Sequence, residues 1–251
     1  QKTHGHPVKV SHDLFEILQR AQILARETDG AFDITAGPMI RLWRTARKQQ
    51  KLPSPVALAA VKNRVGYKKI RLNSRNRTVT LLAANMQLDL GGIAKGFAVD
   101  EAMKTLKANC IHRAFVAASG DMLTSGPPIG HEGWRVLIRN VDQFGNVYPR
   151  TVHLNHQALS TSGDTEQFVL INGQRYSHIV DPRTGYGLTH RIQVTVVSKA
   201  SVKSDSHATA ISVLGHKAGL TFAKRKELQT LILDLKNENP RITQSLYWRL
   251  W

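Results

Sequence analysis

The sequence is poor in cysteine and lacks long apolar runs. Its single cysteine, Cys110, cannot form a disulfide within the chain and has no Cys or His partner at the spacing of a metal site. No stretch is apolar enough to cross a bilayer, so no transmembrane helix is predicted. Residues 1–6 lack the apolar core of a signal peptide, which fits either a cytoplasmic protein or a trimmed form of an exported one.

Acidic residues are also scarce. The chain has 18 Asp and Glu against 35 Lys and Arg, a formal net charge of +17. Such a charge attracts polyanions, including phosphate esters, nucleic acids and anionic membranes. The basic residues are scattered, however, and the sequence shows no zinc-finger spacing, aromatic RNA-binding strand or basic heptad helix. We therefore expect no nucleic-acid partner.

The remaining composition is that of a soluble globular protein, with 41% hydrophobic and 21% charged residues. A chain of 251 residues can bury a substantial core as one large domain or two small ones.

The first part of the chain is predicted to be mainly helical. Ser11 is a suitable N-cap for a helix with apolar residues at helical spacing, and Gly30 is a natural stop. Pro38 and the pair Ser54-Pro55 can each open a further helix. The predicted helices cover residues 11–28, 38–47, 54–66 and a segment from Gly92 to about Lys107, and the predicted strands cover 67–72, 78–82 and 86–90.

The second part of the chain is richer in strands. A polar turn is expected at 160–164, a hairpin tip at 142–146 and a helix from about Asp205. The predicted strands cover residues 114–118, 135–138, 152–154, 168–171, 176–179, 192–197 and 231–235, with a terminal edge strand or packing segment at 246–251. This mixture favours an α+β fold over a regular βαβ repeat.

The segment from Asp89 to Asp100 is the strongest local motif. A strand ends, Gly91 and Gly92 let the backbone approach a ligand, and a helix begins with exposed N–H groups that favour phosphate. Lys95 adds a positive charge at the same place. The spacing fits neither the dinucleotide fingerprint nor the P-loop, and a tight strand-to-helix turn explains the glycines equally well.

A second motif runs from Tyr176 to Gly185. His178 lies where a strand breaks before Asp-Pro, a position from which a histidine can act as a general base, although a structural role is common for a lone histidine. Arg183 could either contact a phosphate or brace the turn.

A third motif contains Asp205 and Thr209. On a helix these two residues share one face, and a carboxylate with a hydroxyl suits a hard cation such as Mg²⁺ or Ca²⁺. An N-capping aspartate beside a solvated threonine is the alternative. His207 lies off that face.

Taken together and in order, these motifs resemble the ApbE family of FAD:protein FMN transferases. The matching segments are GAFDIT at 30–35, GPMIRLW at 37–43, DLGGIAKGFAVD at 89–100, STSGD at 160–164, YSHIVDPRTG at 176–185 and SDSHATA at 204–210. The resemblance implies a single α+β domain over residues 1–251, built from two intimately packed lobes with mixed or antiparallel sheets flanked by helices and FAD bound between them. It also implies that the N-terminal part of the family domain is missing from this chain.

The resemblance also implies site residues. Ala31, Phe32, Asp33, Gly91, Phe97 and Ile179 would contact FAD. Ala94 would offer its carbonyl, and Asp205 and Thr209 their side-chain oxygens, to Mg²⁺, although the same oxygens suit Mn²⁺ and Ca²⁺. His178 would be the candidate base.

The implied reaction is the Mg²⁺-dependent transfer of the FMN half of FAD to a Ser or Thr hydroxyl of an acceptor protein, with release of AMP. Hydrolysis by water, which would make the protein an FAD pyrophosphatase, and flavin binding with weak catalysis are the alternatives. The resemblance further implies a periplasmic or cell-surface location. It also leaves open an anchoring as a lipoprotein, through a segment that is not in this chain.

Three departures from the family pattern stand out. The family's N-terminal FAD-contacting segments do not precede Gln1, its Gly-Gly-Asp is Ser119-Gly120-Asp121 here, and its Ala-Asp-Ala-Leu is Ser204-Asp205-Ser206-His207. The metal-binding Asp and Thr are retained.

Overall fold

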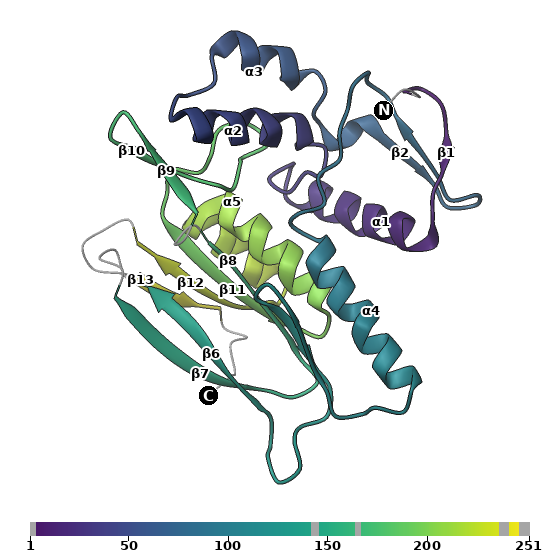
Figure 1. Ribbon diagram of the computed structural model, residues 1–251, viewed down its shortest axis with the longest axis vertical. Coiled ribbons are helices and arrows are strands. Elements are labelled where there is room, and N and C mark those ends of the chain that lie inside the picture. The colour runs from purple at the N-terminus through teal and green to yellow at the C-terminus, as the bar shows by residue number, and fades with distance from the viewer. Residues whose placement is uncertain (1–3, 142–145, 164–166, 236–240, 246–251) are drawn as a thin grey trace. The chain divides into compact units, whose positions relative to one another are not determined.

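The computed structural model describes residues 4–141, 146–163, 167–235 and 241–245 (Figure 1). It contains both helices and antiparallel strands, so the predicted α+β class is confirmed. The chain divides into two compact units, residues 1–90 with 167–189 and residues 91–166 with 190–251. The assignment of the whole chain to one domain stays a prediction. Among the described residues, no helix is long and apolar enough to cross a membrane.

The first unit is mainly helical. Its helices are α1 (His12–Glu27), α2 (Gly37–Gln49), α3 (Pro55–Lys62) and the 3-10 helix η1 (Tyr67–Lys69), and its strands are β1 (Val8–Lys9), β2 (Ile70–Asn73), β3 (Thr78–Leu81), β9 (Phe168–Ile171) and β10 (Gln174–Ser177). The predicted caps are present, since Ser11 Oγ accepts from Leu14 N and Ser54 Oγ accepts from Ala57 N, both at 3.2 Å.

Trp43 on α2 is the centre of the first unit's core. It is 1% exposed and belongs to a cluster of buried side chains that also contains Met39, Ala46, Val65, Val169, Ile171 and Val180. Its indole Nε1 donates to the carbonyl of Ser177 at 2.9 Å, and its ring lies 5.5 Å from that of Tyr176. The core of this unit therefore fixes the end of β10, which directly precedes His178.

The second unit is built on a six-stranded antiparallel sheet of order β13-β12-β11-β8-β5-β4. Its strands are β4 (Phe115–Ala118), β5 (Asp121–Thr124), β8 (Ala158–Gly163), β11 (Ile192–Ser198), β12 (Gln229–Asp234) and β13 (Arg241–Gln244). A separate hairpin pairs β6 (Trp134–Val141) with β7 (Val147–Leu154), and the helices are α4 (Ala94–Ala108) and α5 (Ser201–Arg225).

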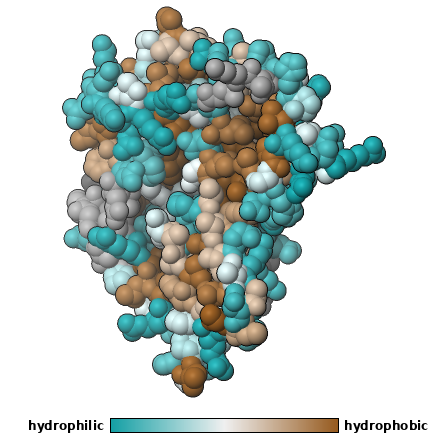
Figure 2. Space-filling view, turned by 45° about the vertical axis from the view of Figure 1, so that its right-hand side comes forward, coloured by the Kyte–Doolittle hydropathy of each residue, from teal (hydrophilic) through white to brown (hydrophobic). Residues whose placement is uncertain are grey.

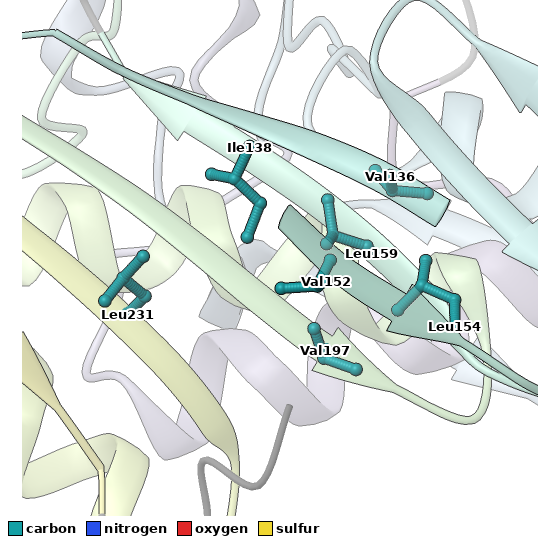
Figure 3. Close-up of a cluster of buried hydrophobic side chains, with 7 residues drawn as sticks. All are labelled: Val136, Ile138, Val152, Leu154, Leu159, Val197 and Leu231. Atoms are coloured by element: carbon teal, nitrogen blue, oxygen red, sulfur yellow. The ribbon is translucent and has the colours of Figure 1, made fainter. Parts of the chain in front are cut away.

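Both faces of this sheet are covered. One face packs against the β6–β7 hairpin through a cluster of aliphatic side chains, Val136, Ile138, Val152, Leu154, Leu159, Val197 and Leu231 (Figure 3). On the other face, Ser160 of β8 bonds to Ser204 of α5 at 2.9 Å. Because β11 lies between these layers, it is buried on both faces, and even its polar residues Gln193 and Thr195 are only 4% and 1% exposed.

Several sequence predictions need correction. Residues 86–90 form no strand; an isolated bridge joins Gln87 to Ala36, and Asp89 N donates to Ile34 O at 2.7 Å. Ser160 to Gly163 are not a turn but most of β8, and Asp164 lies outside the described residues. The strand predicted at 176–179 instead covers 174–177, and the helix predicted from Asp205 begins at Ser201.

Other differences are smaller. The strand predicted from Tyr67 begins at Ile70 after η1, and strands β1, β5 and β13 were not predicted. The predicted hairpin around 142–146 is consistent with the antiparallel pairing of β6 and β7, but most of its tip lies outside the described residues, as does the segment 246–251.

The surface carries both hydrophilic and hydrophobic residues. On the face shown in Figure 2, hydrophilic and hydrophobic residues are interspersed. Among the described residues, the most exposed large hydrophobic ones are Ile129 at 83%, Val56 at 79%, Leu170 at 58% and Leu137 at 57%.

Candidate functional site

The predicted site residues fall into one group in each unit. Ala31, Phe32, Asp33, His178 and Ile179 belong to the first unit. Gly91, Ala94, Phe97, Asp205 and Thr209 belong to the second. The structure describes the geometry of each group within its own unit.

His178 follows β10 and is half-buried. Its backbone N–H donates to the carbonyl of Gln167 at 3.0 Å, and its ring Nδ1 lies 3.1 Å from the same oxygen. Because a carbonyl only accepts hydrogen bonds, Nδ1 carries the proton, and in the neutral ring the lone pair is on Nε2. The chain thereby selects the tautomer in which Nε2 can accept a proton.

The surroundings of His178 also favour the neutral ring. Burial lowers its pKa below the ordinary value of 6.5, and the positive charge of Arg47 lowers it further, while the hydrogen bond to Gln167 acts in the opposite direction. A neutral imidazole near pH 7 is the form that a general base needs.

The segment after His178 is held by backbone contacts. Ile179 N donates to Ser177 Oγ at 3.0 Å, and Ile179 O accepts from Leu188 N at 2.9 Å. A Cβ on Gly187 would lie 2.3 Å from Ser177 O and 2.5 Å from the Trp43 ring, so only glycine fits there. These contacts leave the His178-Ile179 backbone little room to move.

Arg183 pairs with Asp181 in the turn that follows His178. The guanidinium of Arg183 donates from Nε and Nη2 to the two carboxylate oxygens of Asp181, at 2.9 and 2.8 Å. The peptide N–H groups of Thr184 and Gly185 donate to Asp181 O. Arg183 therefore braces the turn, which was one of the two roles left open by the sequence.

Ala31, Phe32 and Asp33 form a buried connection between α1 and α2. The carboxylate Oδ1 of Asp33 accepts from the backbone N and the hydroxyl of Thr35, at 2.8 and 2.7 Å. Burial raises the pKa of Asp33, and its hydrogen bonds to Thr35 partly offset this increase. Asp33 thus closes a local turn, and contact of this segment with FAD stays a prediction.

In the second unit, the glycine motif leads into α4. Gly91 is exposed, Ala94 is the first residue of the helix and is half-buried, and Phe97 is 7% exposed. Ile93 at the N-cap makes no side-chain capping hydrogen bond. The first turn of α4 therefore has no side-chain cap, and of its backbone donors, the feature that favours phosphate at a helix start, the N–H of Gly96 already donates to Asp205.

Asp205 lies in the second turn of α5 and is 4% exposed. Its Oδ2 accepts from the backbone N–H of Gly96 at 2.9 Å, which brings Asp205 to the first turn of α4, two residues after Ala94. Thr209 is four residues further along α5, on the same face as predicted, and is half-buried. The structure thus brings together the segments that carry the three predicted metal ligands.

A lysine and a second aspartate, neither of them among the predicted site residues, lie beside Asp205. Lys95 Nζ forms an ion pair with Asp121 Oδ2 and lies 3.9 Å from Asp205 Oδ1. Asp121 is 2% exposed and opens β5 after the turn Ser119-Gly120, whose residues have φ of 49° and 93°. Although Ser119-Gly120-Asp121 differs from the family's Gly-Gly-Asp, its aspartate still lies at the end of a tight hairpin turn.

The carboxylate of Asp121 affects the neighbouring Asp205. Burial, and then the negative charge of Asp121, raise the pKa of Asp205 to about 6, against the opposing effects of Lys95 and the Gly96 N–H. A site with this surplus of negative charge favours binding of a cation.

Asp100 is a residue that positions α5 and that the sequence analysis did not single out. Its carboxylate accepts from the N–H groups of Ser201 and Val202, at 2.7 and 2.9 Å, and so caps α5 in place of Ala200, which makes no side-chain cap. The position of Asp100 at the end of the glycine motif was the signal in the sequence that could have drawn attention to it. Its partner Ser201 lies 101 residues further along the chain, so the capping contact could not be predicted locally.

The donor set fits a hard divalent cation. One carboxylate, one hydroxyl and one carbonyl are all oxygen donors, and Mg²⁺ commonly uses only one or two protein carboxylates together with water and substrate phosphates. Within the described part of the chain, no group of three or more His, Cys, Asp or Glu side chains is arranged to hold a metal ion. Asp205, Thr209 and Ala94 stay the predicted donors of this site.

Comparisons with known proteins identify relatives over nearly the whole chain. A sequence model of the ApbE family matches residues 1–232. An FAD:protein FMN transferase of Haemophilus influenzae is 31% identical over 245 residues, which cover 95% of this chain and 70% of the relative. One from Salmonella typhimurium is 27% identical and is covered to 68% of its length.

Solved structures agree with these relatives. The flavin transferase ApbE of Vibrio cholerae superposes with a TM-score of 0.90 at 27% identity, over 98% of this chain and 79% of that one. The apo flavinyl transferase ApbE of Pseudomonas stutzeri gives a TM-score of 0.87 at 27% identity, over 98% and 76%. The resemblance stated from the sequence motifs and the expected enzyme class, a transferase, are confirmed.

Proposed function

Because this chain belongs to the ApbE family, we propose that it transfers the FMN half of FAD to a Ser or Thr hydroxyl of an acceptor protein and releases AMP. The observation that carries this proposal is the state of His178. Its Nδ1 is committed to the carbonyl of Gln167, and its lowered pKa keeps the ring neutral near pH 7. A base in this state can take a proton from an acceptor hydroxyl.

In the proposed reaction the acceptor oxygen attacks the FMN phosphorus while His178 Nε2 accepts the hydroxyl proton. A new P–O bond forms to the acceptor, and the P–O bond of the pyrophosphate breaks, so that AMP leaves with the electron pair. The Asp181 turn and Trp43 hold the histidine segment in place.

We assign the metal-binding role to Asp205, Thr209 and the carbonyl of Ala94. Mg²⁺ bound there would supply positive charge to the pyrophosphate. The raised pKa of Asp205 supports this assignment, because a carboxylate with a surplus of negative charge around it gains from a cation. Gly96 fixes the orientation of that carboxylate through its N–H.

We further assign FAD contacts to Ala31, Phe32, Asp33, Gly91, Phe97 and Ile179. The support comes from the motif match and from the backbone donors at the start of α4. A periplasmic or cell-surface location is part of the same proposal and rests on the resemblance alone.

The reaction can be tested by incubating the protein with FAD and Mg²⁺, with and without an acceptor protein, and separating the nucleotides by chromatography. The proposal expects AMP in an amount equal to the FMN that becomes attached to the acceptor. Release of AMP and free FMN without an acceptor would identify an FAD pyrophosphatase instead. Bound FAD that yields no AMP in any mixture would leave only a flavin-binding protein.

A further inference from the structure

Lys95 lies between two buried carboxylates. The side chains of Asp121 and Asp205 are 3% and 6% exposed, whereas that of Lys95 is 44% exposed and reaches solvent. Its ammonium pairs closely with Asp121 and lies 3.9 Å from Asp205 Oδ1. One lysine therefore forms ion pairs with both carboxylates, and the pair with Asp205 has the longer distance.

The two oxygens of Asp205 have different surroundings. Oδ2 accepts the hydrogen bond from Gly96, which is part of the rigid contact between α4 and α5. Oδ1 faces the ammonium of Lys95. The lysine thus lies beside the oxygen that is not fixed by the backbone, which is the oxygen better placed to bind an additional cation.

The charges of this cluster do not cancel. With both carboxylates ionised, the cluster of Asp121, Asp205 and Lys95 has a net charge of minus one, and desolvation makes such a surplus unfavourable. A divalent cation would change the net charge to plus one. The first state repels the pyrophosphate of FAD and the second attracts it.

We propose that Lys95 is a displaceable counter-ion of Asp205, which leaves Oδ1 when a divalent cation binds and is kept beside the site by Asp121. The inference rests on the proposed function, since it takes Asp205 as a metal ligand. Two cations cannot share one carboxylate oxygen at close range without strong repulsion. Asp121 is buried and fixed at the start of β5, so it retains the lysine near the incoming phosphates.

This arrangement makes Lys95 a competitor of the metal ion and a contributor to FAD binding. Replacing it by methionine should strengthen Mg²⁺ binding about fivefold in the absence of FAD, the change that corresponds to losing one partly exposed ion pair. The same replacement should weaken FAD binding in the presence of Mg²⁺. Asp121→Asn should weaken Mg²⁺ binding, because it removes a negative charge and releases the lysine to Asp205.

The test is a titration of the full chain with MgCl₂ in the absence of FAD, in which Mg²⁺ binding is measured by the shift of the thermal unfolding temperature. The proteins compared are the wild type, Lys95→Met, Lys95→Gln and Asp121→Asn. Lys104→Met is the matched control, since it removes the same charge from an exposed position on the same helix, where Lys104 pairs with Glu101. We expect tighter Mg²⁺ binding in both Lys95 variants, weaker binding in Asp121→Asn and no change in the control.

The outcomes separate the inference from the proposed function. Wild-type protein that binds Mg²⁺, with Lys95 variants that bind it equally or less tightly, would overturn the counter-ion role and leave the transferase proposal intact. Wild-type protein that binds no Mg²⁺ and releases AMP in EDTA would overturn the proposed metal site and, with it, this inference.

Discussion

The carboxylate of Asp205 accepts a hydrogen bond from the backbone N–H of Gly96 at 2.9 Å. A Cβ at position 96 would lie 2.8 Å from the Cβ of Asp205 and 2.4 Å from the carbonyl oxygen of Ser201. The glycine is thus required by the close approach of α4 to α5, and it places the first turn of α4 beside the proposed metal ligand.

Gly96→Ala should therefore destabilise the protein by about 1–3 kcal/mol, the usual effect of overpacking. Helix propensity alone predicts the opposite sign, because alanine is favoured over glycine within a helix. Urea unfolding of wild type and variant decides between these outcomes. An equal or higher free energy of unfolding in the variant would show that the two helices can separate at low cost.

Asp100→Ala should also reduce stability, by about 1–2 kcal/mol, because the first N–H groups of α5 lose their cap. Asp13→Ala is a matched control, since Asp13 is exposed in the first turn of α1, where Ser11 provides the cap. Equal effects of the two substitutions in urea unfolding would contradict the capping role.

His178→Gln should reduce the turnover of bound FAD by about 10²–10⁴-fold, the usual contribution of a general base. The affinity for FAD should change little. Calorimetry for binding and AMP release for turnover separate the two effects, and His6→Gln, an exposed histidine, provides the control. A loss of affinity with normal turnover of bound FAD would make His178 a binding residue.

The lowered pKa of His178 also predicts the shape of the pH–rate profile. Because burial keeps the ring neutral to a lower pH than usual, turnover should persist as the pH falls through 6.5 and decline only below that value. A decline that begins above pH 6.5 would contradict the assignment of the base to this buried ring.

The raised pKa of Asp205 predicts how stability depends on pH. The pKa of Asp205 is about 6 in the folded state and has its ordinary value of 3.8 in the unfolded state, so the folded state binds the proton more tightly. The contribution of this proton to the free energy of unfolding is therefore greatest below pH 3.8 and is lost as the pH rises through about 6. Mg²⁺ should reverse this loss, and its stabilising effect should grow above pH 6. Melting temperatures with Mg²⁺ and with EDTA test this, and an Asp205→Asn variant with the same magnesium dependence would contradict it.

Local signals predicted much of this fold. The caps at Ser11 and Ser54 and the apolar spacing located α1 and α3, because these features act within a few residues. Ser160 to Gly163 were misread as a turn because their polar side chains suggested a loop. In the structure, Ser160 and Thr161 are paired by hydroxyls from α5 and β11, at 2.9 Å each.

Part of the candidate site could be proposed from the sequence for the same reason. His178, Asp205 and Thr209 lie in motifs that can be recognised along the chain. The contributions of Asp100 and Asp121 depend on partners far away in sequence, the start of α5 and Lys95. No local pattern distinguishes such residues from solvated charges, so they appear only when the helices and strands are packed together.

The most direct test of the transferase proposal is the intact mass of an acceptor protein after incubation with FAD and this enzyme. We expect the acceptor to gain the mass of one FMN, joined to a Ser or Thr, in Mg²⁺ but not in EDTA or with Asp205→Asn. An acceptor of unchanged mass, while FAD is consumed to AMP and free FMN, would contradict protein flavinylation as the reaction of this chain.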